Sequence, residues 1–304
     1  MTYMAGIEAG GTKFICAVGD SEGKIFKKIR IDTTTPEETI SEVVTFFKSQ
    51  NNQYPIKAIG CGAFGPIDPN KKSTTYGCIT STPKPNWQNF NIVDALSESL
   101  QLPVGFDTDV NAAALGEYYW GSARGLSDFI YLTVGTGIGG GAMINGKLLH
   151  GAMHAEMGHI LIPQDKAKDP FDGICPYHNN CLEGLASGPA LKSRWQVDSA
   201  LKLANDHPAW ETEAEYLAIA LCNYIMTLSP QRIILGGGVM KQRHLFPLIR
   251  QKVKQKLNGY IVNEMVNHLD ESIVPVSLGD NTGVMGALAL AKRAHLEYEM
   301  HEIN

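Results

Sequence analysis

Two cysteines and two histidines lie close together in the second half of the chain and could bind a metal ion. His159 is followed by Cys175, His178 and Cys181. Thiolates and imidazoles are the ligands of closed tetrahedral zinc sites, and a nearby cysteine pair in a reducing compartment indicates a metal more than a disulfide. Each residue alone would be an ordinary core residue or a spare thiol. The combination predicts a structural Zn²⁺ site with no position open to water.

Two glutamates flank this set of ligands. Glu156 precedes His159, and Glu183 follows Cys181. Carboxylates held beside a rigid metal loop can accept hydrogen bonds from the hydroxyl groups of a polyol, although surface solvation is the other common use of such residues. We interpret His154 as a loop residue outside the metal set.

A third group of chemically capable residues is the segment Asp107-Thr108-Asp109-Val110-Asn111. It lies between an apolar strand expected over residues 102–107 and an alanine-rich helix start at Ala112. A carboxylate at such a rigid edge could accept the proton of an attacking hydroxyl, and it could equally cap the helix. The spacing alone leaves both uses open.

Glycine-rich turns occur at three places in the chain. Gly10-Gly11-Thr12-Lys13 and Gly135-Thr136-Gly137 combine bare backbone N–H groups with a hydroxyl, and the first adds a lysine charge. Such loops suit phosphate, because a Cβ would block close approach of the backbone to the anion. Each could also be an ordinary hairpin turn. Gly236-Gly237-Gly238-Val239-Met240 is a third turn, which leads from a buried strand into an expected helix.

The elements that must position these residues follow a repeated pattern. Strands expected over residues 5–18 and 24–26 enclose the first glycine turn, and residues 128–148 repeat the order strand, glycine turn, strand, turn, strand. Helices are expected over 39–50, 213–228 and 283–291, and further strands over 57–62, 102–107 and 232–235. The sequence therefore predicts an α/β protein that arose by internal duplication.

Bulk properties exclude several classes of partner. The chain has 304 residues, which is enough for two lobes, and its formal net charge of −5 provides no basic surface for nucleic acid. No apolar run is long enough to span a membrane and no signal peptide is evident, so we expect a cytoplasmic protein with no membrane partner. The remaining cysteines, Cys16, Cys61, Cys78 and Cys222, are expected to be core residues.

The three glycine motifs together resemble the ROK family of sugar kinases, and within it the bacterial fructokinases. Residues 8–13 are similar to the family's first phosphate motif, residues 135–139 to its second, and residues 236–240 to its adenosine loop. The resemblance implies an actin-like ATPase (ribonuclease H-like) fold, duplicated in two domains with a cleft between them. It implies an N-terminal domain at 1–115, onto which the C-terminal helix 283–304 packs back, and a C-terminal domain at 116–282 with the zinc site.

The resemblance also implies roles for individual residues. Asp109 takes the place of the general base, and Asp107 is left as a cap or loop organiser. Zinc is retained with His178 replacing one of the family's cysteines, and Glu8 stands where the family has an aspartate that positions Mg²⁺ through water. The implied substrate-binding residues are Asn111, Glu156, His159 and Glu183. The implied ATP-binding residues are Gly10, Gly11, Thr12, Lys13, Thr136, Gly137, Gly188, Pro189, Gly236, Gly237, Gly238, Val239 and Met240.

The activity implied is Mg²⁺- and ATP-dependent phosphorylation of a hexose 6-hydroxyl, with D-fructose as the expected hexose and a homodimer as the expected assembly. Two alternatives stay open at this point. One is a kinase of the same fold for mannose, glucose or an N-acetylated amino sugar. The other is a sugar-responsive repressor of the same family, which would need a helix-turn-helix domain before the first strand, where Glu8 leaves no room for it.

Overall fold

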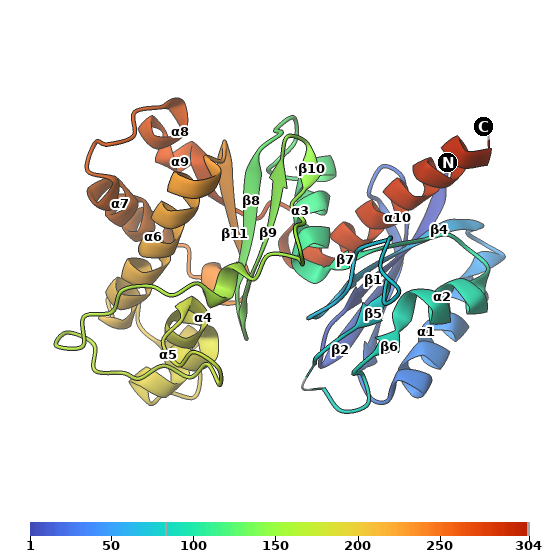
Figure 1. The fold of residues 1–304 in the computed structure, drawn as a ribbon, viewed down its shortest axis with the longest axis horizontal. Coiled ribbons are helices and arrows are strands. Elements are labelled where there is room, and N and C mark those ends of the chain that lie inside the picture. The colour runs from blue at the N-terminus through green and yellow to red at the C-terminus, as the bar shows by residue number, and fades with distance from the viewer. Residues whose placement is uncertain (83, 303–304) are drawn as a thin grey trace. The chain divides into compact units, whose positions relative to one another are not determined.

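The computed structural model describes residues 1–82 and 84–302 and divides them into two compact units. The first unit contains residues 1–124, residues 148–154, and the chain from residue 277 onward. The second unit contains residues 125–147 and 155–276. The boundary expected at residue 115 falls inside a helix, α3, which runs from Asp109 to Trp120. Figure 1 shows both chain ends in the first unit.

The elements of the first unit are built around one five-stranded sheet. They are β1 (Tyr3–Ala9), β2 (Lys13–Asp20), β3 (Ile25–Asp32), α1 (Pro36–Asn51), β4 (Ile56–Ala63), β5 (Cys78–Ile79), β6 (Phe90–Asn91), α2 (Ile92–Leu100), β7 (Val104–Thr108), α3 (Asp109–Trp120), the 3-10 turn η4 (Gly279–Asn281) and α10 (Thr282–Glu302).

The elements of the second unit surround a second five-stranded sheet. They are β8 (Phe129–Val134), β9 (Ile138–Ile144), β10 (Lys147–Leu148), η1 (Met157–His159), α4 (Leu182–Ala186), α5 (Gly188–Trp195), η2 (Ala200–Lys202), α6 (Ala209–Leu228), β11 (Arg232–Gly236), η3 (Val239–Lys241), α7 (Leu245–Leu257), α8 (Glu264–Asn267), α9 (Leu269–Ser272) and β12 (Ile273–Pro275).

The two sheets have the same topology. The first has the strand order β3-β2-β1-β4-β7 and the second β10-β9-β8-β11-β12. In the first sheet β2 is antiparallel to β1 and β3, while β4 is parallel to β1 and β7. In the second, β9 is antiparallel to β8, and β11 is parallel to β8 and β12. This correspondence supports the internal duplication that the repeated glycine hairpins predict.

Helix α10 lies directly on the first sheet and on α3 (Figure 1). The close approach depends on glycine: a Cβ on Gly60 of β4 would lie 1.8 Å from the carbonyl oxygen of Ala287, and one on Gly286 would lie 2.2 Å from the backbone of Ala112. Any larger residue would push the helix off its neighbours. Leu288 and Met285 of α10 fill the space beside Met4 and Ala58 of the sheet.

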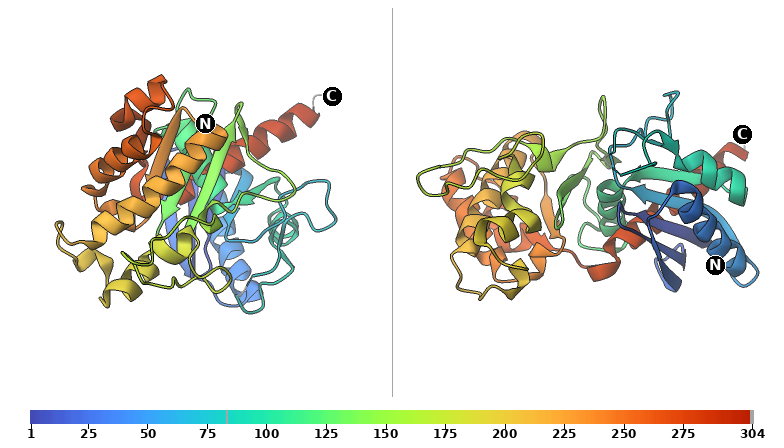
Figure 2. Two further views of the ribbon diagram at one scale, coloured as in Figure 1. Left: turned by 60° about the vertical axis from the view of Figure 1, so that its left-hand side comes forward. Right: turned by 90° about the horizontal axis from the view of Figure 1, so that it is seen from below.

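The opposite face of the first sheet carries the larger apolar core. Side chains that alternate with Met4 along β1, namely Ala5, Ile7 and Ala9, pack with Val43 and Phe47 of α1. The views in Figure 2 show α1 and α2 together beside this sheet. The sheet is thus covered by α1 and α2 on one face and by α10 on the other, which fixes the strand ends that carry the predicted loops.

A buried carboxylate in α3 fastens two further segments of the first unit. Glu117 is fully buried, and its side chain accepts hydrogen bonds from the backbone N–H groups of Ser122 (2.6 Å), Ser277 (3.1 Å) and Leu278 (3.3 Å). The Ser277 hydroxyl donates a further bond at 3.0 Å. Because these donors satisfy the charge, the carboxylate holds the points where the chain leaves and re-enters this unit.

In the part of the chain that the structure describes, no helix combines the length and the apolar character needed to cross a bilayer. Cys16, Cys61 and Cys78 are buried, as predicted for core residues, and Cys222 is partly buried.

Candidate functional site

The first glycine loop, residues 10–13, is a tight hairpin between β1 and β2. The N–H of Gly10 donates to the carbonyl of Lys13 at 3.0 Å, and a Cβ on Gly10 would lie 2.8 Å from that oxygen. Thr33, at the end of β3, braces the hairpin through bonds to the carbonyls of Gly10 (2.7 Å) and Thr12 (3.0 Å). The side chains of Thr12 and Lys13 are exposed. The loop therefore presents one hydroxyl and one ammonium group on a rigid base.

Glu8 lies beneath the first turn of α10. A Cβ on Gly283 of that turn would come within 2.3 Å of the Glu8 carboxyl carbon. Burial raises the pKa of Glu8, and the charges of Lys13 and Lys28 oppose this shift. The carboxyl group of Glu8 therefore packs against the first turn of α10.

The segment 107–111, at the end of β7 and the start of α3, carries two carboxylates with different surroundings. Thr108 caps α3, since its hydroxyl accepts from the N–H of Asn111 at 3.1 Å, so neither aspartate is the cap. Asp109 is the first residue of α3, is half-buried, and accepts from the N–H of Val110 at 2.9 Å. Asp109 therefore stands at the rigid helix start where a general base was predicted.

Asp107 is instead a buried carboxylate within a polar network, 4% exposed. Its Oδ1 accepts from the N–H of Thr108 (2.8 Å) and from the side-chain amide of Asn111 (2.8 Å). Its Oδ2 lies 2.9 Å from Nε2 of His150, and this contact raises the pKa of His150 above its usual value. The sequence interpretation did not include His150, because the residue lies 43 positions from Asp107 along the chain.

His154 has a structural role that its expected loop position did not suggest. It is 4% exposed, and its Nε2 accepts the backbone N–H of Ile67 at 3.2 Å. Together with His150 it ties residues 148–154 to the first unit, and a backbone turn with a bond from Gly151 to Met153 connects the two histidines.

The second glycine loop, residues 135–137, connects β8 and β9 in the second unit. The N–H of Gly135 donates to the carbonyl of Gly137 at 2.9 Å, and Thr136 is exposed at the tip. The N–H of Gly188, the first residue of α5, donates to the carbonyl of Gly135 at 2.8 Å, while Pro189 occupies the first turn of that helix. The positive end of an eight-residue helix thus adjoins the loop, which suits an anionic ligand.

The third glycine loop lies against the second. Gly237 has φ +90°, and a Cβ there would lie 2.3 Å from the Val134 carbonyl oxygen. A Cβ on Gly135 would be 3.7 Å from the N–H nitrogen of Gly238. The loop opens into the 3-10 turn Val239–Lys241, whose Val239 and Met240 side chains are buried, and helix α7 follows from Leu245. In the second unit the structure therefore brings together the three predicted nucleotide segments 135–137, 188–189 and 236–240.

The predicted metal ligands converge in the same unit. The ligand atoms of His159, Cys175, His178 and Cys181 all lie within 4.8 Å of one another. The Cys175 sulfur is 3.7 Å from Nδ1 of His159 and 3.6 Å from Nδ1 of His178, and the Cys181 sulfur is 3.6 Å from Nδ1 of His159. Tetrahedral zinc with Zn–S near 2.3 Å and Zn–N near 2.0 Å places neighbouring donor atoms about 3.6 Å apart. The donor set therefore fits Zn²⁺.

Glu183 connects the metal cluster to the second glycine loop. One carboxylate oxygen lies 3.8 Å from Nε2 of His159, and the other accepts the N–H of Ile138 at 2.9 Å. A Cβ on Gly137 would lie 2.7 Å from the Glu183 carboxylate, so a larger residue there would displace this side chain. Glu156 is exposed at the start of η1. Glu183 and Ile138 are 45 residues apart along the chain, so the sequence pattern did not predict this contact.

Known proteins resemble this chain over most of its length. The sequence profile of the ROK family matches residues 4–294. The chain is 47% identical to a fructokinase of Lactococcus lactis, over 85% of this chain and 87% of the relative, and 43% identical to a fructokinase of Pediococcus pentosaceus, over 96% and 98%. It is also similar to the crystal structure of a ROK family glucokinase from Streptomyces griseus in complex with glucose and AMPPNP. That structure has a TM-score of 0.76 and 27% identity, covering 96% of this chain and 99% of the other.

Proposed function

Because the chain belongs to the ROK family, we propose that it transfers the γ-phosphoryl group of ATP to the 6-hydroxyl of D-fructose. The observation that carries this proposal is the likeness to fructokinases over almost the whole chain, at 43% identity and 96% coverage for one relative. The convergence of three glycine segments in the second unit supports a nucleotide ligand independently of the relatives' names.

Phosphoryl transfer requires an aligned hydroxyl, a group that accepts its proton, and compensation of phosphate charge. We assign the proton acceptor to Asp109, whose position at the start of α3 is fixed by the Thr108 cap. Asn111 follows it on the same helix and is assigned to hexose binding. Glu156, His159 and Glu183 complete the proposed hexose set in the second unit.

The glycine segments are assigned to ATP. In the second unit the exposed Thr136 hydroxyl, the N-terminus of α5 at Gly188 and the loop at Gly237 can donate to phosphate or approach the adenosine closely. In the first unit Thr12 and Lys13 supply a hydroxyl and a positive charge. Mg²⁺ would accompany ATP and neutralise phosphate charge, with Glu8 as the carboxylate of this chain assigned to its hydration shell.

We propose that zinc is bound by His159, Cys175, His178 and Cys181. All four positions of a tetrahedral ion would be filled by protein, so the ion would serve a structural purpose. Nδ1 is the His159 nitrogen that faces the sulfurs, so Nε2 would carry the proton and face Glu183. A carboxylate in that position orients a metal-bound imidazole. The zinc would thereby hold Glu183 in place at the second glycine loop.

A homodimer is the assembly that the family resemblance suggests, and we retain it as part of the proposal. Light scattering coupled to size-exclusion chromatography measures the mass directly. A mass near 33.1 kDa, that of one chain, would reject the dimer.

The proposed function is tested by ADP release in a coupled assay with fructose, mannose, glucose and N-acetylmannosamine as acceptors, and with a reaction lacking sugar as the control. Fructose should give the highest kcat/KM, and the product should be fructose 6-phosphate by mass and by NMR. A higher kcat/KM for another hexose would make that hexose the assigned substrate in place of fructose, and the assignment as a kinase would stand. No ADP above the sugar-free control with every hexose would reject the kinase itself.

A further inference from the structure

A short excursion of the chain places a histidine beside the proposed hexose-binding helix. Residues 148–154 belong to the first unit although the chain on both sides of them belongs to the second. Within this segment His150 reaches the end of β7, where its Nε2 lies 2.9 Å from Oδ2 and 3.1 Å from Oδ1 of Asp107. No sequence motif marks this residue, and neither the proposed base nor the metal cluster includes it.

The Asp107 carboxylate determines how the Asn111 amide is oriented. Asn111 is 3% exposed and lies in the first turn of α3, with its amide group 2.8 Å from Oδ1 of Asp107. An ionised carboxylate can only accept hydrogen bonds, so the NH₂ group of Asn111 must face it. The carbonyl oxygen of Asn111 is consequently turned to the other side, where it can accept a hydrogen bond from a hydroxyl.

His150 adds a hydrogen-bond donor and a positive charge to this arrangement. The Asp107 carboxylate is 4% exposed, so its hydrogen-bond donors must come from the protein. His150 provides one of these donors, because a carboxylate can only accept and the Nε2 atom that faces it must carry a proton. The hydrogen bond to Asp107 favours the doubly protonated ring and raises the pKa of His150. The side chain of His150 is 36% exposed, so bulk pH can change this charge.

We propose that His150 is a positioning residue for hexose binding: as an imidazolium it makes a charge-assisted hydrogen bond to Asp107, and Asp107 in turn holds the Asn111 amide with its oxygen available to a sugar hydroxyl. This inference rests on the proposed kinase function, because it assigns the ligand of Asn111 to the hexose. His150 acts through Asp107 and Asn111 and does not itself accept the proton of the hydroxyl, since its Nε2 already carries a proton directed at Asp107.

The charged and titratable groups around the pair set the expected pH range. The pKa of His150 is raised above 6.5, first by its hydrogen bond to Asp107, while burial and the charge of Arg293 on α10 oppose the rise. Tyr76 and Glu297 lie nearby; the pKa of Tyr76 is raised to about 12, so the tyrosine stays neutral in the range of interest. The imidazolium is present below the raised pKa and is lost as pH increases through it. A neutral imidazole donates a weaker hydrogen bond to Asp107 than an imidazolium does, so hexose affinity should decrease on the alkaline side.

The experiment compares H150Q and H150K with the wild-type enzyme, and H295Q serves as the matched control. His295 is also paired with a carboxylate in the first unit, Glu299 at 3.3 Å, but it lies on α10 outside the proposed site. H150Q should raise KM for the hexose about tenfold, because glutamine can donate to Asp107 without the charge, while KM for ATP stays within about twofold. H150K should keep a low KM to higher pH than the wild type does, and H295Q should match the wild type.

The pH profile separates positioning from simple structural support. In the wild type, kcat/KM for the hexose should decrease above the His150 pKa, and this decrease should be absent in H150Q and H150K. An unchanged hexose KM in H150Q, or the same alkaline decrease in all variants, would overturn the inference while leaving the kinase activity established. Absence of wild-type turnover with every hexose would instead reject the proposed function, and with it this inference.

A measurement on the wild type covers the case in which the variants do not fold. The ring signals of the nine histidines can be followed by NMR against pH, with and without the hexose. If the imidazolium form favours hexose binding, the hexose must raise the apparent pKa of His150, since linkage is reciprocal. A His150 titration that the hexose leaves unchanged would refute the proposal.

Discussion

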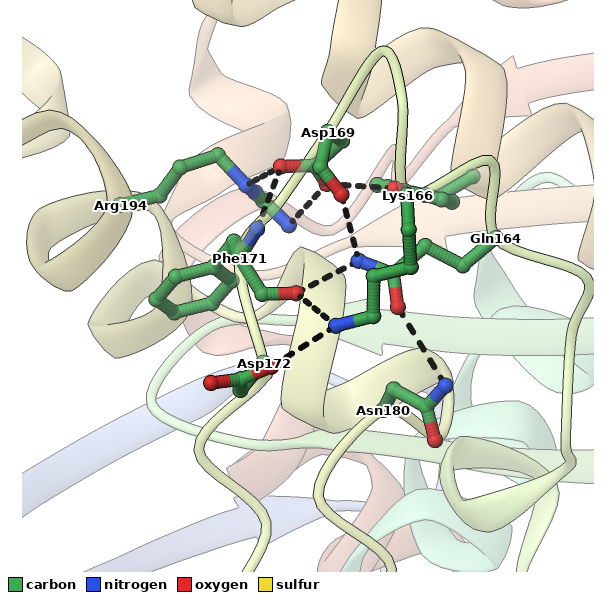
Figure 3. A network of polar contacts seen from close by, with 8 residues as sticks. Gln164, Lys166, Asp169, Phe171, Asp172, Asn180 and Arg194 are labelled. Carbon is green, nitrogen blue, oxygen red and sulfur yellow. Dashed lines mark hydrogen bonds and ion pairs between the residues drawn. The ribbon is translucent and has the colours of Figure 1, made fainter.

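The substitution Asp169→Asn tests whether a buried ion pair anchors residues 163–174, the loop that precedes Cys175. Nε of Arg194 donates to Oδ1 of Asp169 at 3.2 Å, and the terminal nitrogen Nη2 lies 3.2 Å from Oδ2 in ion-pair contact (Figure 3). The side chains of Arg194 and Asp169 are only 6% and 12% exposed. The Arg194 guanidinium stacks on Phe171 at 4.6 Å and on Tyr216 at 5.4 Å.

The burial of this ion pair determines how much unfolding free energy Asp169→Asn should lose. Removing one partner of a buried pair costs roughly 3–5 kcal/mol, because the other charge is left uncompensated. The introduced asparagine would keep an oxygen that can accept from Arg194, so we expect the lower end, about 3 kcal/mol. Glu213 is a second carboxyl group close enough to Arg194 to interact with its charge. Burial raises the pKa of Glu213 well above 4.5, and the charge of Arg194 opposes that rise. Loss of the Asp169 charge should allow Glu213 to ionise.

The control is Asp172→Asn in the same loop. Lys166 contacts Asp172 at 2.9 Å, with side chains 49% and 92% exposed, so this substitution should cost less than about 1 kcal/mol. Urea unfolding at neutral pH gives the free energies, and the rate of tryptic cleavage at Lys166 and Lys168 reports local opening of the loop. Cleavage should be faster in D169N than in D172N.

The double variant D169N/E213Q completes the test. It should be less stable than the two single effects predict, since it removes both carboxylates near Arg194. Equal stabilities of D169N and D172N, together with additivity in the double variant, would refute the anchoring argument.

Four further outcomes are expected. Asp109→Asn should keep ATP binding and lose most of kcat, because the proton acceptor is removed at constant size; near-normal kcat would reject Asp109 as the base. Thr136→Val should raise KM for ATP more than KM for fructose, since it removes a hydroxyl at the second glycine loop; unchanged ATP kinetics would count against that loop. Elemental analysis should find about one Zn²⁺ per wild-type chain and much less in Cys181→Ser. Cys181→Ser should also weaken the binding of both the hexose and ATP, because Glu183 contacts the Ile138 N–H at the second glycine loop. A wild-type chain free of zinc would eliminate the site. Glu213→Gln should be more stable than the wild type at neutral pH. A carboxyl group whose pKa is higher in the folded than in the unfolded protein destabilises the folded protein increasingly as pH rises above the unfolded pKa. Equal pH dependence of the unfolding free energy in both proteins would contradict the raised pKa.

The sequence by itself was sufficient for the repeated design and for the local motifs. The duplicated hairpins at residues 10–13 and 135–137 are set by glycine, whose permissive backbone leaves a signature within a few positions. The convergence of His159, Cys175, His178 and Cys181 was also predictable, because thiolates and imidazoles have few other reasons to gather within a short stretch.

Long-range partners were decided only by the tertiary structure. His150 pairs with Asp107 across 43 positions and Glu183 with Ile138 across 45, and nothing in the local pattern specifies either contact. The capping role of Thr108 likewise emerged only from backbone geometry, since three neighbouring residues of cap-forming type compete for one position. Side-chain contacts of this kind depend on how separate elements pack, and packing is a property of the whole folded chain, whereas turn and ligand motifs are written in consecutive residues.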